Sequence, residues 1–171
     1  MKKVSYSVLA LMFLANLAYA ELVTSYKGNF QLDPEVMHKG PITGVMSLLF
    51  ENSVFTLVQI DLDKPILGSK VYQSKEQSMV TVNREGLAPQ MSVVYRLDRP
   101  KHNWYFVVVA NSPQNEDGTF QKDVFAGHIY KVAATMDEIL NLVRDGIDTI
   151  PPSWKPVGAT TLTATGTVTI E

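Results

Sequence analysis

The chain contains no cysteine among its 171 residues. This absence excludes disulfides, thiolate nucleophiles, cysteine-based zinc sites and thiol redox exchange. Stability must therefore come from packing or from a partner. Histidine is almost as rare: His38, His102 and His128 are the three, and no two have the H-x-H or H-x-x-x-H spacing of a metal site. We interpret them as unrelated surface or packing residues, with His102 as the one to consider for ligand contact.

Sequence motifs that indicate catalysis are missing as well. Neither the G-x-S-x-G elbow of serine hydrolases nor the S-x-x-K motif occurs after residue 20. The glycines are scattered singly, which excludes a glycine-rich phosphate loop. A triad assembled from residues far apart in the sequence stays open, since catalytic groups meet in space. We assign no catalytic residue; a protein that is not an enzyme is the favoured interpretation, and an enzyme is the alternative.

The first twenty residues have the features of a cleavable signal peptide. Lys2 and Lys3 form a positive start, residues 8–15 form a short apolar run, and Ala18-Tyr19-Ala20 fits a signal peptidase site. We therefore expect Glu21 to begin an exported protein that is periplasmic or secreted. A membrane anchor is the alternative, but it requires about twenty apolar residues.

Removing residues 1–20 leaves 151 residues, which is enough for a single domain with its own core. Thirteen basic and 17 acidic residues remain in this part, a net charge of −4. A mildly acidic surface argues against nucleic acid or anionic lipid as the main partner. No further run of about 18 apolar residues follows, so we expect no transmembrane segment after signal cleavage.

Short β-forming runs alternate with turn residues along the rest of the chain. Residues 54–62 alternate with period two, and residues 44–50 precede them closely enough to form a hairpin through residues 51–53. Residues 91–97 repeat the pattern. Residues 104–110 are apolar on both faces, which predicts a strand that is covered on both sides. Weaker strand predictions are residues 22–30, 70–72, 79–83 and 128–133.

One segment has the signals of a helix. Thr135 and Glu138 form a capping box, and the apolar residues that follow recur at helical spacing. Arg144 and Gly146 suit the end of a helix, since a cation favours the negative pole and glycine favours the left-handed conformation beyond the last turn. The sequence therefore predicts a short helix near residues 135–145.

These patterns predict that residues 21–171 form one mainly β domain, an antiparallel sandwich of seven to nine strands with the single short helix. The strand number and alternation resemble those of immunoglobulin-type or C2-type sandwiches, although the Cys-Trp-Cys signature of antibody domains is missing. A β-barrel is the structural alternative, because local patterning is the same in open and closed sheets.

Aromatic side chains near one turn are candidates for ligand contact. Trp104 and Tyr105 follow His102 closely, and aromatic faces stack well on sugar rings. Because adjacent residues of a strand point to opposite faces, Trp104 and Tyr105 cannot line the same pocket.

Three aspartates form a candidate calcium site. Asp61 and Asp63 share one strand face, and Asp98 belongs to a second copy of the same Leu-Asp-basic-Pro turn. If both turns lie at one end of the domain, the carboxylates would resemble calcium ligands held between sandwich loops. Solvated strand ends are the alternative interpretation. Calcium is the only cofactor that the sequence suggests.

A final strand, residues 160–170, follows a proline-rich connector at residues 150–157. Threonines occupy one face of this strand, and the other face carries Leu162, Ala164, Gly166, Val168 and Ile170. The connector would let the strand swing away and pair with the sheet edge of a neighbouring subunit, as in β-augmentation. The alternative is a strand that completes the sheet of its own domain.

The sequence supports two function hypotheses. The first is a non-enzymatic, exported, protein-binding or structural module that self-associates or serves as a subunit of a cell-envelope or surface assembly. The second is a carbohydrate or small-ligand binding domain, or a hydrolase acting on polysaccharide, built on the aromatic residues and the aspartate edge.

Overall fold

The computed structural model describes residues 20–33, 40–51, 54–97 and 104–170, with side chains from residue 25 to residue 166 within these ranges. The predicted signal peptide lies outside the described residues apart from Ala20, where the first strand begins. Within the described part, no helix is both long enough and apolar enough to cross a membrane.

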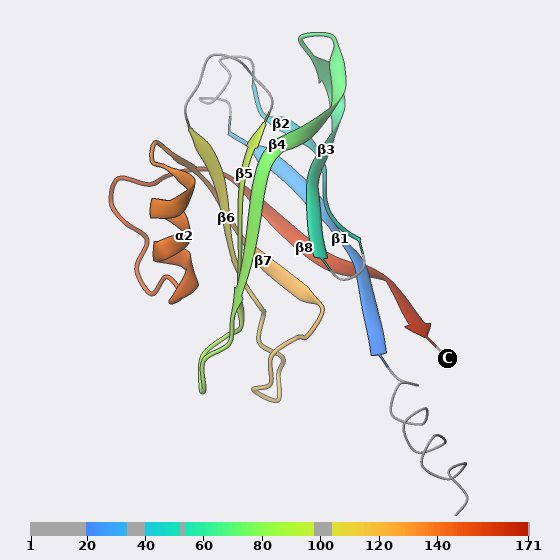
Figure 1. Cartoon of the computed structure of the whole chain (residues 1–171), viewed down its shortest axis with the longest axis vertical. Helices are drawn as coiled ribbons and strands as arrows, with labels where there is room; N and C mark the ends of the chain where they lie inside the picture. Colours follow the sequence, from blue (N-terminus) through green and yellow to red (C-terminus); the bar gives the residue numbers. More distant parts are fainter. Residues whose placement is uncertain (1–19, 34–39, 52–53, 98–103, 171) are drawn as a thin grey trace, which may run out of the picture.

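Eight antiparallel strands form a closed barrel in simple sequence order, and one helix lies outside it (Figure 1). The elements are β1 (Ala20–Leu32), β2 (Ile42–Glu51), β3 (Val54–Ile66), β4 (Ser69–Val82), β5 (Gln90–Leu97), β6 (Tyr105–Asn111), β7 (Val124–Val132), α2 (Met136–Arg144) and β8 (Lys155–Ile170). Each strand pairs with the next, and β8 pairs with both β7 and β1.

The predicted sandwich is therefore wrong, and the barrel given as its alternative is correct. The eight strands fall within the predicted number, and the period-two alternation is present. The difference arises because β8 pairs with β1 from Gly158–Leu32 onward, which joins the two ends of the sheet. Pairing between residues so far apart in the sequence leaves no trace in local patterning.

The inside of the barrel is an apolar core to which every strand except β4 contributes fully buried or nearly buried side chains. Tyr26, Phe50, Phe55 and Phe125 pack with ring centroids 5.6–6.1 Å apart at the end where β3 and β7 begin. Aromatic rings at such distances attract each other beyond their area burial. This aromatic cluster fills one end of the barrel.

A second apolar cluster lies on the outer face, between the barrel and α2. Val107 and Val109 of β6 point to this side, whereas Val108 and Ala110 point into the barrel. The helix packs Ile139, Leu140 and Val143 onto the same cluster. The absence of a polar face on residues 104–110 is explained by this double coverage.

The helix prediction is confirmed in detail. Thr135 Oγ1 accepts from the Glu138 amide, and the Glu138 carboxylate accepts from the Thr135 amide at 2.8 Å, so the capping box is complete. Asp145 caps the end, and Gly146 follows with a φ of 77°. Beyond the end of the helix, Asp148 forms a salt bridge of 2.7 Å with Arg84.

Several strands are longer than predicted. The predicted hairpin of residues 44–50 and 54–62 is present as β2 and β3, and the turn at residues 52–53 lies outside the described residues. Residues 70–72 and 79–83 belong largely to the single strand β4, whose register shifts between Ser74 and Glu76. This irregularity in the strand hides the continuity of the pattern.

Candidate functional site

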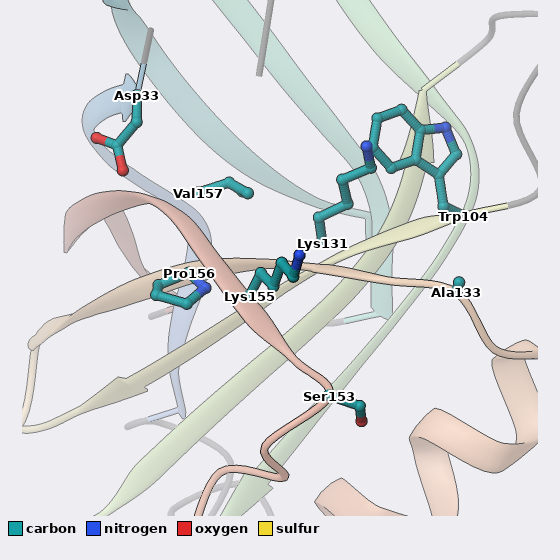
Figure 2. A pocket seen from close by; sticks show the side chains of 8 residues that line it. All are labelled: Asp33, Trp104, Lys131, Ala133, Ser153, Lys155, Pro156 and Val157. Atoms are coloured by element: carbon teal, nitrogen blue, oxygen red, sulfur yellow. The ribbon is translucent and has the colours of Figure 1, made fainter. Parts of the chain in front are cut away.

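A depression of about 380 Å³ lies at the end of the barrel opposite the aromatic cluster, where β1 and β7 end and β8 begins. Figure 2 shows the residues that line it, which come from these strand ends, from the residue that precedes β6 and from the segment after α2. They are Asp33, Trp104, Lys131, Ala133, Ser153, Lys155, Pro156 and Val157.

Two lysines reach this depression because β7 and β8 pair there. Lys131 lies directly opposite Lys155 in the ladder, beyond a register shift between Ile129 and Tyr130. Opposite residues of an antiparallel pair project to the same face, so the two side chains share one side. The Asp33 amide donates to the Val157 carbonyl at 2.8 Å, which fixes the end of β1 beside the start of β8.

The positive charges of the two lysines are not paired with carboxylates. The Lys131 ammonium lies 2.9 Å from the centroid of the Trp104 ring, a cation–π contact. Neither lysine forms a salt bridge with any carboxylate in the part of the chain that the structure describes. Figure 2 shows Asp33 on the far side of the depression from Trp104. We call Trp104, Lys131 and Lys155 the lysine site.

The electrostatic environment of Lys131 favours an anion. Burial lowers the pKa of Lys131 below its ordinary value, and the nearby charge of Lys155 lowers it further. Both effects disfavour the charged ammonium form of Lys131. A negative group placed between the lysines would supply them.

A row of aromatic rings leads from the lysine site into the barrel. Trp104 lies 5.9 Å from Phe106, and Phe106 stacks on Tyr95 at 5.5 Å. Tyr95 is fully buried, and its hydroxyl has no hydrogen-bond partner among the described residues. This burial raises the pKa of Tyr95. A buried polar atom without a partner is rare in folded proteins.

The predicted aromatic candidates separate as their alternation requires. Trp104 lines the depression, whereas Tyr105 lies on the other face of β6 and packs in the cluster under α2. The Tyr105 hydroxyl donates to Glu76 at 2.8 Å, and the Arg96 guanidinium lies 5.7 Å from its ring centroid. His102 lies outside the described residues.

The predicted calcium ligands are not brought together by the described residues. Asp61 accepts hydrogen bonds from the Gln59 amide at 3.1 and 3.3 Å, and Asp63 accepts from the Thr43 hydroxyl at 2.6 Å. Asp98 lies outside the described residues. No group of three or more histidine, aspartate or glutamate side chains in the described ranges is placed to hold a metal ion. The calcium site stays a prediction that depends on Asp98.

The predicted partner strand lies within its own barrel. Leu162 is fully buried in the core, and β8 pairs with β1 on one side and with β7 on the other as far as Thr163. Ala164 continues along β1, as do the backbones of Val168 and Ile170, whose side chains are not described. Gly166 lies in the same strand, β8.

Sequence reasoning missed both lysines, although one of them left a signal. Lys131 follows Ile129 at the alternate position, so it falls on the inward face of β7 together with a buried residue. A charge on an apolar strand face is unusual, and it could have identified Lys131 as a candidate. Comparisons with protein-family models, with curated proteins and with solved structures found no match to this chain.

Proposed function

We propose that this chain is a binding protein that takes a small amphipathic anion, such as a carboxylate with an apolar body, at the lysine site. One observation carries the proposal: two lysines share one face at the end of an apolar barrel without a carboxylate partner among the described residues. This deepens the small-ligand hypothesis and replaces the aspartate edge with a positive site.

The anionic group of the ligand would lie between Lys131 and Lys155. A carboxylate there accepts charge-assisted hydrogen bonds, which are stronger than neutral ones. It also offsets the repulsion by Lys155, which is one of the two effects that lower the pKa of Lys131.

The apolar body would contact Trp104 and Val157, which belong to the apolar part of the lining. An eight-stranded barrel is wide enough to be filled by side chains or to hold one small ligand.

Binding rather than catalysis is proposed because the lining contains one hydroxyl, Ser153, and no described group positioned to activate it. A nucleophile needs an adjacent base within hydrogen-bond reach. We further propose, from the sequence, that the protein acts after export and that it associates with protein.

Tryptophan fluorescence tests the proposal directly. The chain has two tryptophans, and Trp154→Phe leaves Trp104 as the single emitter at the site. The exported, processed protein is titrated with decanoate and with decanol, which share an apolar chain but differ in charge. Since a hydrogen bond to a charged group contributes about 1.5–3 kcal/mol, decanoate should bind at least about tenfold more tightly.

Matched variants separate the site from general charge effects. Lys131→Met should remove most of the preference for decanoate, whereas Lys122→Met, an exposed lysine outside the depression, should leave it unchanged. Equal affinity for decanoate and decanol, or equal effects of the two variants, would exclude an anion site at Lys131.

A further inference from the structure

The hairpin of β3 and β4 projects from the barrel. Because the strands run up and down in sequence order, β3 ends and β4 begins at the end of the barrel where β1 and β7 end and β8 begins. Ile66 pairs with Ser69, so a two-residue turn of Leu67 and Gly68 forms the tip. Figure 1 shows this hairpin at the top of the view, reaching past the other strand ends. The tip therefore lies at the same end of the barrel as the lysine site.

The turn at the tip has an unfavourable residue for its backbone conformation. Leu67 has a φ of 49°, and Gly68 has a φ of 84°. Tight hairpin turns with two left-handed residues favour asparagine, aspartate and glycine. Leucine is disfavoured in this conformation because its Cβ atom crowds the following carbonyl oxygen. Leu67 is the only residue other than glycine with a positive φ in the part of the chain that the structure describes.

No contact among the described residues compensates for this cost. The Leu67 side chain is 79 % exposed, which makes it the most exposed of the large apolar side chains that the structure describes. A Cβ atom added at Gly68 would have no heavy atom within 4 Å apart from its chain neighbours, so no other described segment covers the tip. Backbone strain that brings no internal contact is typical of a residue that acts on another molecule.

The charges around Leu67 indicate what kind of surface it contacts. Residues 64–70 read Lys-Pro-Ile-Leu-Gly-Ser-Lys, with one lysine three residues before Leu67, another three residues after it, and no acidic residue. Lys64 and Lys70 are exposed, and neither forms a salt bridge with a described residue. The neighbouring carboxylate of Asp63 accepts from the Thr43 hydroxyl at 2.6 Å. An exposed apolar side chain between two such cations is suited to a layer of anionic lipid headgroups.

We propose that the hairpin tip, residues 64–70, binds the surface of an anionic membrane. Leu67 enters the headgroup layer, and Lys64 and Lys70 contact lipid phosphates. Residues 21–171 carry a net charge of −4, which repels such a surface and confines the contact to the locally positive tip. The contact does not depend on the ligand proposed for the lysine site. It would, however, hold that end of the barrel near the membrane.

Vesicle binding tests the proposal. The processed protein, without decanoate, is sedimented with vesicles of phosphatidylcholine alone or of phosphatidylcholine mixed with phosphatidylglycerol. Only the anionic vesicles should bind the protein, and added salt should release it. The double variant Lys64→Gln/Lys70→Gln should bind at least about tenfold more weakly, since each lysine near an anionic surface contributes a factor of about five. Lys27→Gln/Lys122→Gln removes the same charge from exposed positions outside the tip and should bind nearly as the wild type does.

Leu67→Asn separates the apolar contact from the stability of the fold. Asparagine tolerates the left-handed conformation, so the variant should be at least as stable as the wild type in thermal unfolding. It should nevertheless bind anionic vesicles about tenfold more weakly, because it lacks the apolar side chain. Leu87→Asn is the matched control. It changes an exposed leucine between β4 and β5, at the opposite end of the barrel, and should leave vesicle binding unchanged.

A fluorescent label shows which part of the protein enters the membrane. The chain has no cysteine, so Leu67→Cys introduces a single thiol that can carry a nitrobenzoxadiazole group. Its emission should shift to the blue on anionic vesicles, whereas the same label on Leu87→Cys should not respond. Equal binding to both kinds of vesicle, full binding by Leu67→Asn, or an unchanged emission at position 67 would each overturn the proposal.

The result is independent of the ligand proposed for the lysine site. Because the vesicle assay contains no decanoate, the protein can fail to bind vesicles and still bind decanoate, and the reverse also holds. A protein that binds neither kind of vesicle would overturn the membrane contact and would indicate that Leu67 contacts a protein instead.

Discussion

Tyr95 and Phe106 lie directly opposite each other on β5 and β6, and their rings stack with centroids 5.5 Å apart and planes inclined by 21°. The stack fixes Tyr95 in the barrel core, where its side chain is fully buried. Its hydroxyl nevertheless lacks a hydrogen-bond partner among the described residues. An unsatisfied buried hydroxyl costs about 1–3 kcal/mol, so the position of this hydroxyl is unfavourable.

Tyr95→Phe keeps the ring stack and removes only the hydroxyl. We expect the free energy of unfolding of the ligand-free protein to rise by about 1 kcal/mol, because an unsatisfied polar atom is lost. Urea denaturation measures the change. Tyr105→Phe is the control, since it removes a hydroxyl that donates to Glu76 and should lower stability. A decrease in stability for Tyr95→Phe would show that the hydroxyl is already satisfied.

Tyr95 should also affect the stability of the protein at alkaline pH. Burial raises the pKa of Tyr95 above its ordinary value of 10.0, so the unfolded chain ionises there first. The contribution of Tyr95 to folding is therefore complete below about pH 10 and is lost as the pH rises further. Between about pH 10 and pH 12, Tyr95→Phe should lose less stability than the wild-type protein in urea unfolding. Equal losses would contradict the assignment.

A glycine controls the approach of two barrel strands. Gly127 of β7 lies opposite Ala110, and a Cβ atom at this position would lie 2.0 Å from the Val109 carbonyl oxygen. Gly127→Ala must push β6 and β7 apart, and we expect a loss of roughly 3 kcal/mol, the upper range for overpacking. The neighbouring change Ala126→Gly should cost about 1 kcal/mol or less, because it alters only strand propensity. Thermal unfolding of both variants measures the difference.

The local elements were predictable because their signals lie within a few residues. Thr135 and Glu138 identify the helix start without any tertiary information, and alternation placed Trp104 and Tyr105 on opposite faces. Barrel closure depends on pairing between β1 and β8, which no local pattern records. Single glycines inside strands do indicate where two backbones approach closely. Gly28 is an example, because a Cβ atom there would lie 1.6 Å from the Thr161 carbonyl oxygen.

The lysine site could not be predicted from the sequence, because it too depends on pairing between strands. Lys131 and Lys155 meet because of the β7–β8 register and its shift after Ile129. A one-residue change in register would turn Lys155 to the other face. The sequence could therefore identify Lys131 as a charge on an apolar face, but it could not predict that Lys155 lies beside it.

The helix cap offers a test of the outer layer. Thr135→Ala removes the side-chain part of the capping box, and we expect a loss of about 1 kcal/mol. Thr149→Ala, an exposed threonine after the helix, is the control and should be neutral. Hydrogen bonds from the backbone and the hydroxyl of Thr135 lower the pKa of Glu138 from 4.5. The difference between wild type and Thr135→Ala in urea unfolding should therefore be complete above that pH and shrink as the pH falls below it.

The lysine site predicts a pH dependence of ligand binding. Because burial and then the charge of Lys155 lower the pKa of Lys131 from 10.5, Lys131 loses its proton before an ordinary lysine does. The affinity for decanoate, measured by Trp104 fluorescence in the Trp154→Phe background, should therefore begin to fall at a lower pH than the titration of an ordinary lysine would cause. The affinity for decanol should stay constant as the pH rises, since its binding involves no charge.

Two variants identify the group that titrates. Lys131→Met should bind decanoate weakly at neutral pH and show little further decline, because the titrating ammonium is gone. Lys155→Met removes the repulsion that lowers the pKa of Lys131, so the decline should begin at higher pH. If Lys155→Met left the decline in decanoate affinity at the same pH or moved it to lower pH, repulsion by Lys155 would not be what lowers the pKa of Lys131. That result would contradict an anion site between the two lysines.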